Sequence, residues 1–91
     1  MNSSEELQEW LKMVLSAMVS RPDEIEVEKK SDEMGVLYTV RMAKEDRGML
    51  IGRGGINVNA VRTLLRHIGR MIDVRASLVL EMPPLKSQTD N

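Results

Sequence analysis

A short glycine-rich segment, Gly52-Arg53-Gly54-Gly55, is the part of the sequence best suited to chemistry. Glycine has no Cβ and tolerates positive φ angles, so the backbone of a ligand can approach such a segment closely. The residues that follow are apolar at helical spacing, which predicts a helix start (Ile56, Ala60, Val61, Leu64, Leu65 and Ile68). A helix start offers free N–H groups and the positive end of the helix dipole, and Arg53 adds a charge. We therefore predict that this segment holds phosphate.

The spacing of the glycines separates the kinds of phosphate site. A Walker loop ends in glycine, lysine and serine or threonine, whereas Gly55 is followed by Ile56 and Asn57. The dinucleotide fingerprint requires a third glycine at position 57 and a strand before the loop, but a short helix is predicted there. The remaining pattern is helix, Gly-x-x-Gly, helix, which is that of KH domains. In these domains the loop clamps the backbone of a single-stranded nucleic acid.

Longer stretches around the loop resemble a known family. The run from Ala43 to Gly55 reads AKEDRGMLIGRGG, and it resembles the KH core of small stand-alone bacterial proteins of the KhpA type. The segments Ala60–Thr63 (AVRT) and Arg21–Val27 (RPDEIEV) resemble the same family, so the likeness covers about residues 4–82. One departure is Gly54, which stands where the family often carries a second polar or basic residue. This departure implies one phosphate contact fewer.

The resemblance implies a single-stranded RNA-binding protein that acts as an RNA chaperone or post-transcriptional regulator. It also implies a second KH-containing partner of the KhpB type and a link to cell-envelope growth and cell shape. Self-association is a further expectation, because four bound nucleotides and one short loop supply little affinity unaided. Two alternatives stay open. One is a protein-interaction module with RNA binding reduced or lost, which would dock through Glu24, Glu26 and Glu28. The other is a single-stranded DNA binder.

The predicted RNA-binding residues lie in the loop and on the two helices around it. The loop backbone and Arg53 would hold phosphates, and Arg62 on the following helix is the best further candidate. By resemblance, Leu50, Ile51, Val58 and Val61 contribute to an aliphatic floor of the groove, although the sequence does not divide them between groove and core. Arg66 and Arg70 continue the stripe of Arg62, but Arg70 is some 25 Å from the loop by helix rise. The predicted set is Lys44, Arg47, Ile51, Gly52, Arg53, Gly54, Gly55, Asn57, Val58 and Arg62.

Composition limits the other classes of function. The 91 residues make one domain, and 42% hydrophobic residues are ordinary for a globular protein. The net charge is −1, but residues 1–34 carry nine acids and four bases, whereas residues 35–91 carry five acids and nine bases. The lone His67 and the absence of cysteine argue against a metal site, a cofactor and an enzyme. No signal peptide or membrane-spanning segment is predicted, and a cytoplasmic location is the expectation.

Hydrophobic periodicity and turn residues predict the elements that position the loop. Ser3 and Glu6 form a capping-box pattern at the start of the first helix. The predicted elements are a helix over about residues 4–19, strands over 24–30 and 36–42, a helix over 44–50, the loop 52–55, a helix to 71 and a strand over 73–82. Pro83 and Pro84 close the last strand, and a flexible polar tail over 85–91 follows a single domain over 1–84.

The order α-β-β-α-α-β predicts an α+β fold of the type II KH class. Two helices join the second and third strands, so a right-handed crossover should place these strands parallel. The expected architecture is a three-stranded mixed sheet covered on one face by three helices.

Overall fold

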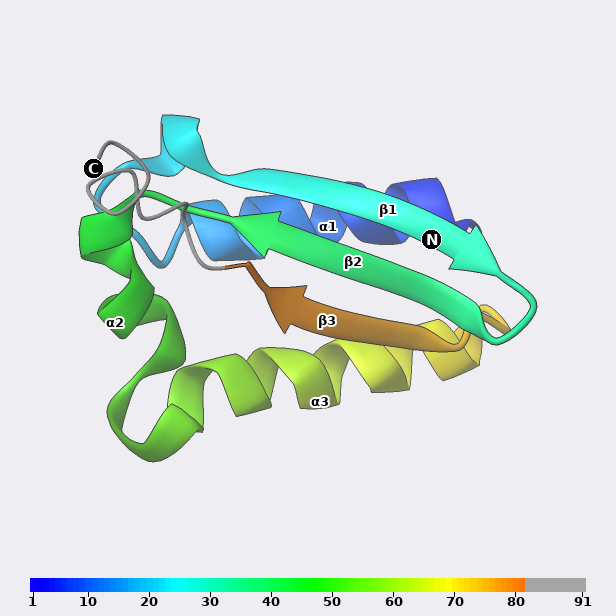
Figure 1. Cartoon of the computed structure of the whole chain (residues 1–91). Helices are drawn as coiled ribbons and strands as arrows, with labels where there is room; N and C mark the ends of the chain where they lie inside the picture. Colours follow the sequence, from blue (N-terminus) through cyan, green and yellow to red (C-terminus); the bar gives the residue numbers. More distant parts are fainter. Residues whose placement is uncertain (82–91) are drawn as a thin grey trace, which may run out of the picture.

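The computed structural model describes residues 1–81, and their order of elements confirms the predicted α+β fold of the type II KH class (Figure 1). The helices and strands are α1 (Ser4–Ser16), β1 (Glu26–Asp32), β2 (Gly35–Arg41), α2 (Arg47–Ile51), α3 (Ile56–Met71) and β3 (Ala76–Leu80). Short 3-10 turns over Pro22–Glu24, Lys44–Asp46 and Arg53–Gly55 join them. The predicted tail over 85–91 and the predicted domain boundary at residue 84 lie outside the described residues.

The sheet has the order β1-β2-β3 and is mixed, as predicted. β1 pairs with β2 antiparallel through a hairpin, and β2 pairs with β3 parallel, with Val36 opposite Ala76 and Val40 opposite Leu80. The connection from β2 to β3 passes through α2, the loop and α3, which is the crossover that a parallel pair requires. β3 therefore lies at an edge of the sheet, beside the helix that follows the loop.

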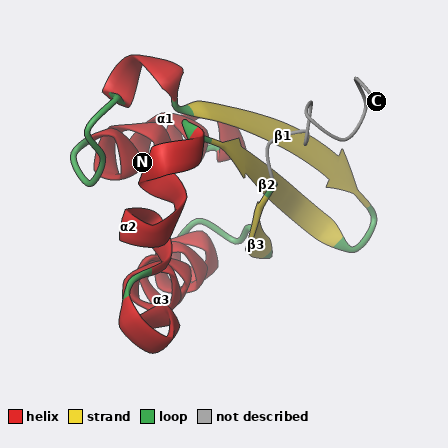
Figure 2. Cartoon of the chain, turned by 60° about the vertical axis from the view of Figure 1, so that its left-hand side comes forward, coloured by secondary structure: helices red, strands yellow, loops and turns green. Residues whose placement is uncertain are grey.

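All three helices lie on the same side of the sheet, and no helix of residues 1–81 lies on the other side (Figure 2). α1 packs on β1, and α3 packs on β3 and also on α1 and α2. The core between these layers has leucines from α1, alternate residues of β2 and β3, and one stripe of α3 (Leu7, Leu11, Leu15, Tyr38, Val40, Val58, Val61, Leu65, Ala76 and Leu78). Alternation along the strands and helical spacing along α1 and α3 thus direct one face of each element to a shared interior.

Several boundaries differ from the prediction. α1 ends at Ser16 and not near residue 19, β1 runs over 26–32, and β3 is confined to 76–80. The turn between β1 and β2 is shorter than expected because an Asp32 Oδ1 atom accepts the N–H groups of Met34 and Gly35, at 2.7 and 3.2 Å. This side chain closes the hairpin, so that the strands extend to within two residues of each other.

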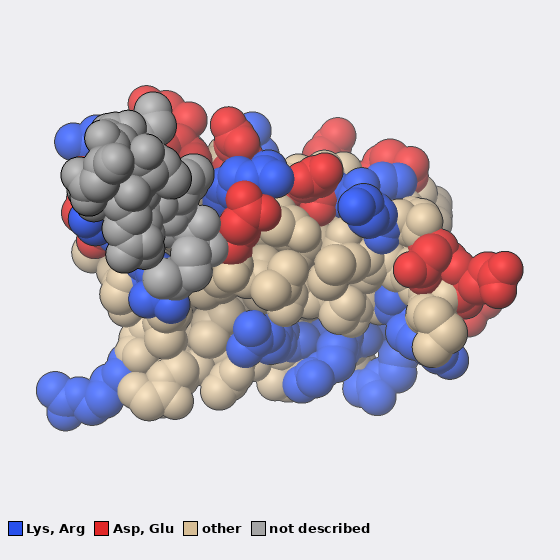
Figure 3. Space-filling view, viewed as in Figure 1, with Lys and Arg blue, Asp and Glu red and all other residues tan. Residues whose placement is uncertain are grey.

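Charged side chains are segregated on the surface. Figure 3 shows Lys and Arg gathered along the α3 side of the molecule, whereas Asp and Glu lie along β1 and at the hairpin end. The sequence accounts for this, because five arginines and no Asp or Glu occur between Asp46 and Asp73. The loop and α3 thus form the basic part of a chain whose net charge is −1.

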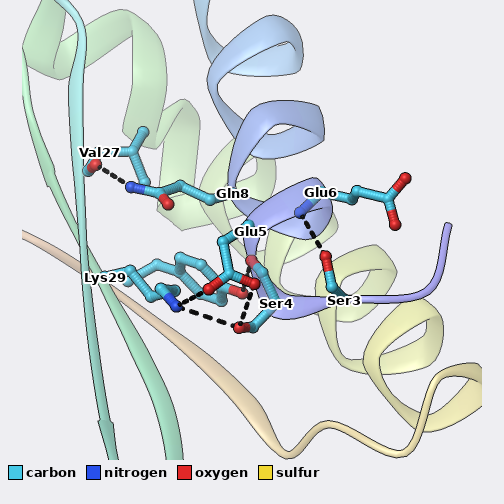
Figure 4. A network of polar contacts seen from close by, with 8 residues as sticks. Ser3, Ser4, Glu5, Glu6, Gln8, Val27 and Lys29 are labelled. Carbon is cyan, nitrogen blue, oxygen red and sulfur yellow. Dashed lines mark hydrogen bonds and ion pairs between the residues drawn. The ribbon is translucent and has the colours of Figure 1, made fainter.

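Polar contacts fasten the start of α1 to the sheet (Figure 4). Ser3 accepts the N–H of Glu6 at 3.2 Å, which is the N-cap that the sequence predicts. The Lys29 ammonium contacts Glu5 at 2.7 Å, and the Tyr38 hydroxyl donates to the Ser4 carbonyl at 2.7 Å. Burial raises the pKa of Tyr38 to about 12. These contacts fix α1 across the strands that precede the loop.

Candidate nucleic-acid interface

The loop between α2 and α3 is a compact turn built on three glycines with positive φ. Gly52 ends α2 with φ 76° and ψ 170°, and its N–H donates to the Gly48 carbonyl at 2.8 Å. Gly54 and Gly55 have φ angles of 64° and 82°, and the Gly55 N–H donates to the Gly52 carbonyl at 3.0 Å. The backbone therefore turns sharply between the two helices, and residues with a Cβ would be strained at each of these positions.

Asn57 holds this turn from the first turn of α3. Its Nδ2 donates to the Met49 carbonyl at 2.9 Å, which ties α3 to the end of α2. A Cβ on Gly52 would lie 2.7 Å from Asn57 Cγ and 3.0 Å from its backbone nitrogen. Glycine at position 52 thus allows both the backbone angle and the close approach of Asn57. The structure gives this asparagine a bracing contact, and its predicted contact with RNA stays a prediction.

Arg53 is the exposed charge of the loop. None of its nitrogen atoms forms a hydrogen bond or ion pair with any residue in the described part of the chain. α3 begins directly after the loop at Ile56 and has no side-chain cap, so its positive end is not covered by a side chain of its N-cap residue. An exposed guanidinium thus stands three residues before an uncapped helix start, and this combination suits an anionic group.

Arg62 lies where α3 meets the open edge of β3. Its Nε donates to the Leu78 carbonyl at 3.3 Å, and its Nη1 donates to Asn59 Oδ1 at 3.1 Å. These bonds hold the half-buried side chain along the strand edge, about two helical turns from the loop. Of the other predicted cations, Lys44 is exposed in the turn before α2, and Arg47 is half-buried at the first residue of α2.

The apolar residues predicted to floor a groove divide between core and surface. Leu50, Val58 and Val61 are at most 7% exposed and belong to the core, so Val58 has little side chain to offer a ligand. Ile51 is half-buried at the end of α2 and remains next to the loop. Hydrophobic periodicity does not separate core from groove positions, because apolar side chains occur at both on a short helix.

Two exposed apolar residues beside the loop were missed by the sequence prediction. Met49 is 52% exposed and Ile56 is 66% exposed. Ala60 and Leu64 on the same helix are exposed as well as Ile56. Ile56, Ala60 and Leu64 form a second apolar stripe, on the opposite side of α3 from the buried residues. The sequence contains a signal for this stripe, because Ile56 and Val58 are about 200° apart on a helical wheel.

A buried carboxylate sets the direction of α2. Asp46 is 1% exposed and accepts the Ser20 N–H and hydroxyl at 3.1 and 2.6 Å, and the Arg21 N–H at 3.0 Å. These hydrogen bonds, led by that from the Ser20 hydroxyl, lower the pKa of Asp46. The carboxylate thus joins the segment after α1 to the residue just before α2, which carries the loop.

Other kinds of site find no support in the described residues. Within residues 1–81, no group of three or more His, Asp or Glu side chains is placed to hold a metal ion. In the same part of the chain, no helix has both the length and the apolar character needed to cross a membrane.

Comparison with known proteins decides the family. The model of the KhpA/KhpB KH domain matches residues 8–80. The chain belongs to the KhpA/KhpB KH-domain family. Similar proteins include the RNA-binding protein KhpA of Chlamydia pneumoniae, 32% identical over 72 residues that cover 79% of this chain and 92% of that protein. The RNA-binding protein KhpA of Streptomyces coelicolor is 34% identical over 73 residues, which cover 80% of this chain and 91% of that protein. No solved structure matches the chain significantly.

Proposed function

We propose that this chain binds single-stranded RNA and that the Gly52–Gly55 loop clamps its backbone. The loop backbone and Arg53 contact the phosphates, and about four nucleotides lie along the groove beside α2 and α3. The observation that carries the proposal is the three-glycine turn, with an arginine that pairs with no side chain of residues 1–81, at the start of the uncapped helix α3. The names of the relatives, RNA-binding protein KhpA, support RNA as the ligand.

Recognition of bases rests on aliphatic contact. Ile51, Met49 and Ile56 supply accessible apolar surface around the loop. The only aromatic residues are Trp10, which packs against the core from α1, and Tyr38, which is buried. Neither gives the stacking platform that base-stacking proteins use. We therefore expect low specificity for the RNA sequence. The proposed function is binding alone and assigns no catalytic role to the residues around the loop.

Partners and physiology follow from family membership as proposals. The chain acts in the cytoplasm as an RNA chaperone or post-transcriptional regulator that supports cell-envelope growth and cell shape. It works with a second KH-containing protein of the KhpB type or with a second copy of itself. The exposed residues Leu64 and Met71, farther along α3 from the loop, provide apolar surface for such a partner.

The contacts of the acidic strand disfavour the alternative of a protein-interaction module. Glu26 and Glu28 lie 3.7 and 2.8 Å from the guanidinium of Arg41, and Glu24 lies 3.1 Å from that of Arg21. The proposed docking carboxylates are thus paired within the chain, so a basic partner would have to compete with these arginines. Single-stranded DNA is tested directly by the experiment below.

The test is fluorescence-anisotropy binding of a labelled tetranucleotide RNA to the wild type and to Arg53→Asp/Gly54→Asp. Aspartate tolerates the φ of 64° at position 54 better than most residues, so the variant should fold, which circular dichroism checks. Lys12→Asp/Lys30→Ala is the control, because it makes the net charge more negative by the same three units on α1 and β1, away from the loop. We expect loss of binding only in the loop variant.

The salt dependence should be shallow, because few phosphates are contacted. With two to four neutralised phosphates, log K falls against log salt with a slope of roughly −1.4 to −2.8. Equal loss in the control variant, or no wild-type binding at low salt, would contradict the proposal. Equal binding of DNA of the same sequence would show that the 2′-hydroxyl is not read.

A further inference from the structure

A cavity of about 640 Å³ lies at the opposite end of α3 from the glycine loop. Its walls come from the β1–β2 hairpin, the end of α3 and the segment that enters β3, including Gly35 and Ala76. This size is within the range of roughly 300–1,000 Å³ of small-molecule sites. The cavity adjoins the same open edge of β3 that Arg62 borders nearer to the loop.

Three arginines line this cavity without partners. Arg66 and Arg70 come from α3, and Arg75 comes from the segment before β3. All three are exposed, and none forms a hydrogen bond or ion pair through its side chain with a residue of the described range 1–81. By contrast, Arg21 and Arg41 are each paired with at least two carboxylates. The three guanidiniums therefore remain available to an anionic ligand.

Carboxylates in the same cavity restrict where an anion can lie. Asp32, Glu33 and Asp73 also line it, and none is within ion-pair distance of its three arginines. Asp32 is already engaged by the N–H groups that close the hairpin. Asp32 and Glu33 lie on the hairpin side, and Asp73 follows the end of α3. A phosphate would thus be repelled from the hairpin and favoured beside Arg66 and Arg70 on the helix itself. A nucleic-acid strand would thus pass along α3 and not over the hairpin.

The arginines of α3 connect the cavity with the loop. Arg62, Arg66 and Arg70 are spaced four residues apart, so they form one stripe along the helix. From Ile56 to Arg70 the helix rises about 21 Å, which corresponds to roughly six nucleotides at a stacked spacing of ~3.4 Å. The four nucleotides of a KH groove therefore do not reach Arg70.

We propose that this cavity is a second phosphate-binding site, which holds the continuation of the RNA strand clamped by the loop. The inference rests on the proposed function, and it adds that the ligand is longer than a KH tetranucleotide. Arg66, Arg70 and Arg75 contact phosphates at the far end of the strand, and Arg62 borders the path between the two sites.

The test compares a tetranucleotide with a decanucleotide RNA in the binding assay described above. The variant is Arg66→Ala/Arg70→Ala, and the control is Lys12→Ala/Lys30→Ala, which removes the same charge elsewhere. We expect the wild type to bind the decanucleotide more tightly and with a steeper salt slope. In the arginine variant this advantage should disappear, with the slope falling by about 1.4 for two lost phosphate contacts. Binding of the tetranucleotide should stay within twofold.

A second variant changes affinity in the opposite direction. Asp73 has a φ of 62°, a conformation that asparagine accepts readily, so Asp73→Asn should keep the backbone. Removing its negative charge should strengthen binding of the decanucleotide and leave the tetranucleotide unchanged. Amide shifts in nuclear magnetic resonance spectra should appear at residues 66–76 only with the longer RNA.

The outcomes separate this inference from the proposed function. Failure of Arg53→Asp/Gly54→Asp to weaken tetranucleotide binding would overturn the loop as the clamp. If that variant behaves as expected but Arg66→Ala/Arg70→Ala loses no more decanucleotide affinity than the lysine control, the second site is wrong and the clamp stands. Weaker tetranucleotide binding in the Arg66→Ala/Arg70→Ala variant would also overturn the second site, because those arginines would then belong to the first.

Discussion

Alanine substitutions at two glycines of the loop should have different costs. Gly52 has φ 76° and ψ 170°, a region that is essentially restricted to glycine and costs other residues about 1–3 kcal/mol. A Cβ there would also displace Asn57 and break its hydrogen bond to Met49, which adds about 0.5–1.5 kcal/mol. We expect Gly52→Ala to lower the free energy of unfolding by about 2–4 kcal/mol in total.

Gly54 provides the matched comparison two residues away. Its φ is 64°, but a Cβ would meet no atom within 4 Å. Only the left-handed backbone is penalised, so Gly54→Ala should cost about 1–2 kcal/mol. The assay is urea unfolding followed by the fluorescence of Trp10, the only tryptophan. For a domain of this size, 1 kcal/mol corresponds to about 4–8 °C in the melting temperature, which provides an independent readout.

A double-mutant cycle isolates the role of Asn57. In an Asn57→Ala background the clash with the Asn57 side chain is gone, and only the 3.0 Å approach to the backbone nitrogen of residue 57 remains. Gly52→Ala should therefore cost less than in the wild type, whereas the cost of Gly54→Ala should not change. The expected coupling between positions 52 and 57 is at least about 0.5 kcal/mol. Equal costs for the two glycine variants, or zero coupling, would refute the account of Asn57 as the brace of the loop.

Three further predictions concern the residues that hold the loop in place. The ultraviolet titration of Tyr38, the only tyrosine, should have a midpoint of about 12 in the folded protein and about 10 in urea, and a folded midpoint near 10 would contradict its burial. Because the pKa is higher in the folded state, the stability linked to Tyr38 is complete below pH 10 and is lost as the pH rises toward 12. Folding lowers the pKa of Asp46, so its contribution to the free energy of unfolding is lost as the pH falls below about 4. Asp46→Asn should therefore make the free energy of unfolding less dependent on pH in the acid range, and an unchanged dependence would contradict the prediction. Gly69→Ala would place a Cβ 2.5 Å from the Val74 carbonyl oxygen, so the melting temperature should fall although alanine favours helices, and an increase would show that α3 can move away from β3.

The sequence alone determined the order of elements and the character of the loop. Alternation along β1 and β2, helical spacing in α1 and α3, and the glycines at 52–55 are local signals, and the structure confirms the elements they predict. The parallel pairing of β2 with β3 was also accessible, because chirality leaves one arrangement for a strand-helix-strand crossover.

Only the tertiary structure decided how individual side chains are used. Asp46 reads as an ordinary acid near a helix start, and its burial depends on Ser20, which is 26 residues away in sequence. Ile56 and Val58 are both apolar, yet one is exposed and the other is in the core, because α1 and β3 cover only one side of α3. Likewise, the arginines of α3 and Arg75 meet the hairpin at one cavity only after the chain has folded. Periodicity specifies which face an element can bury, but contacts between distant segments determine which residues on that face remain available to a ligand.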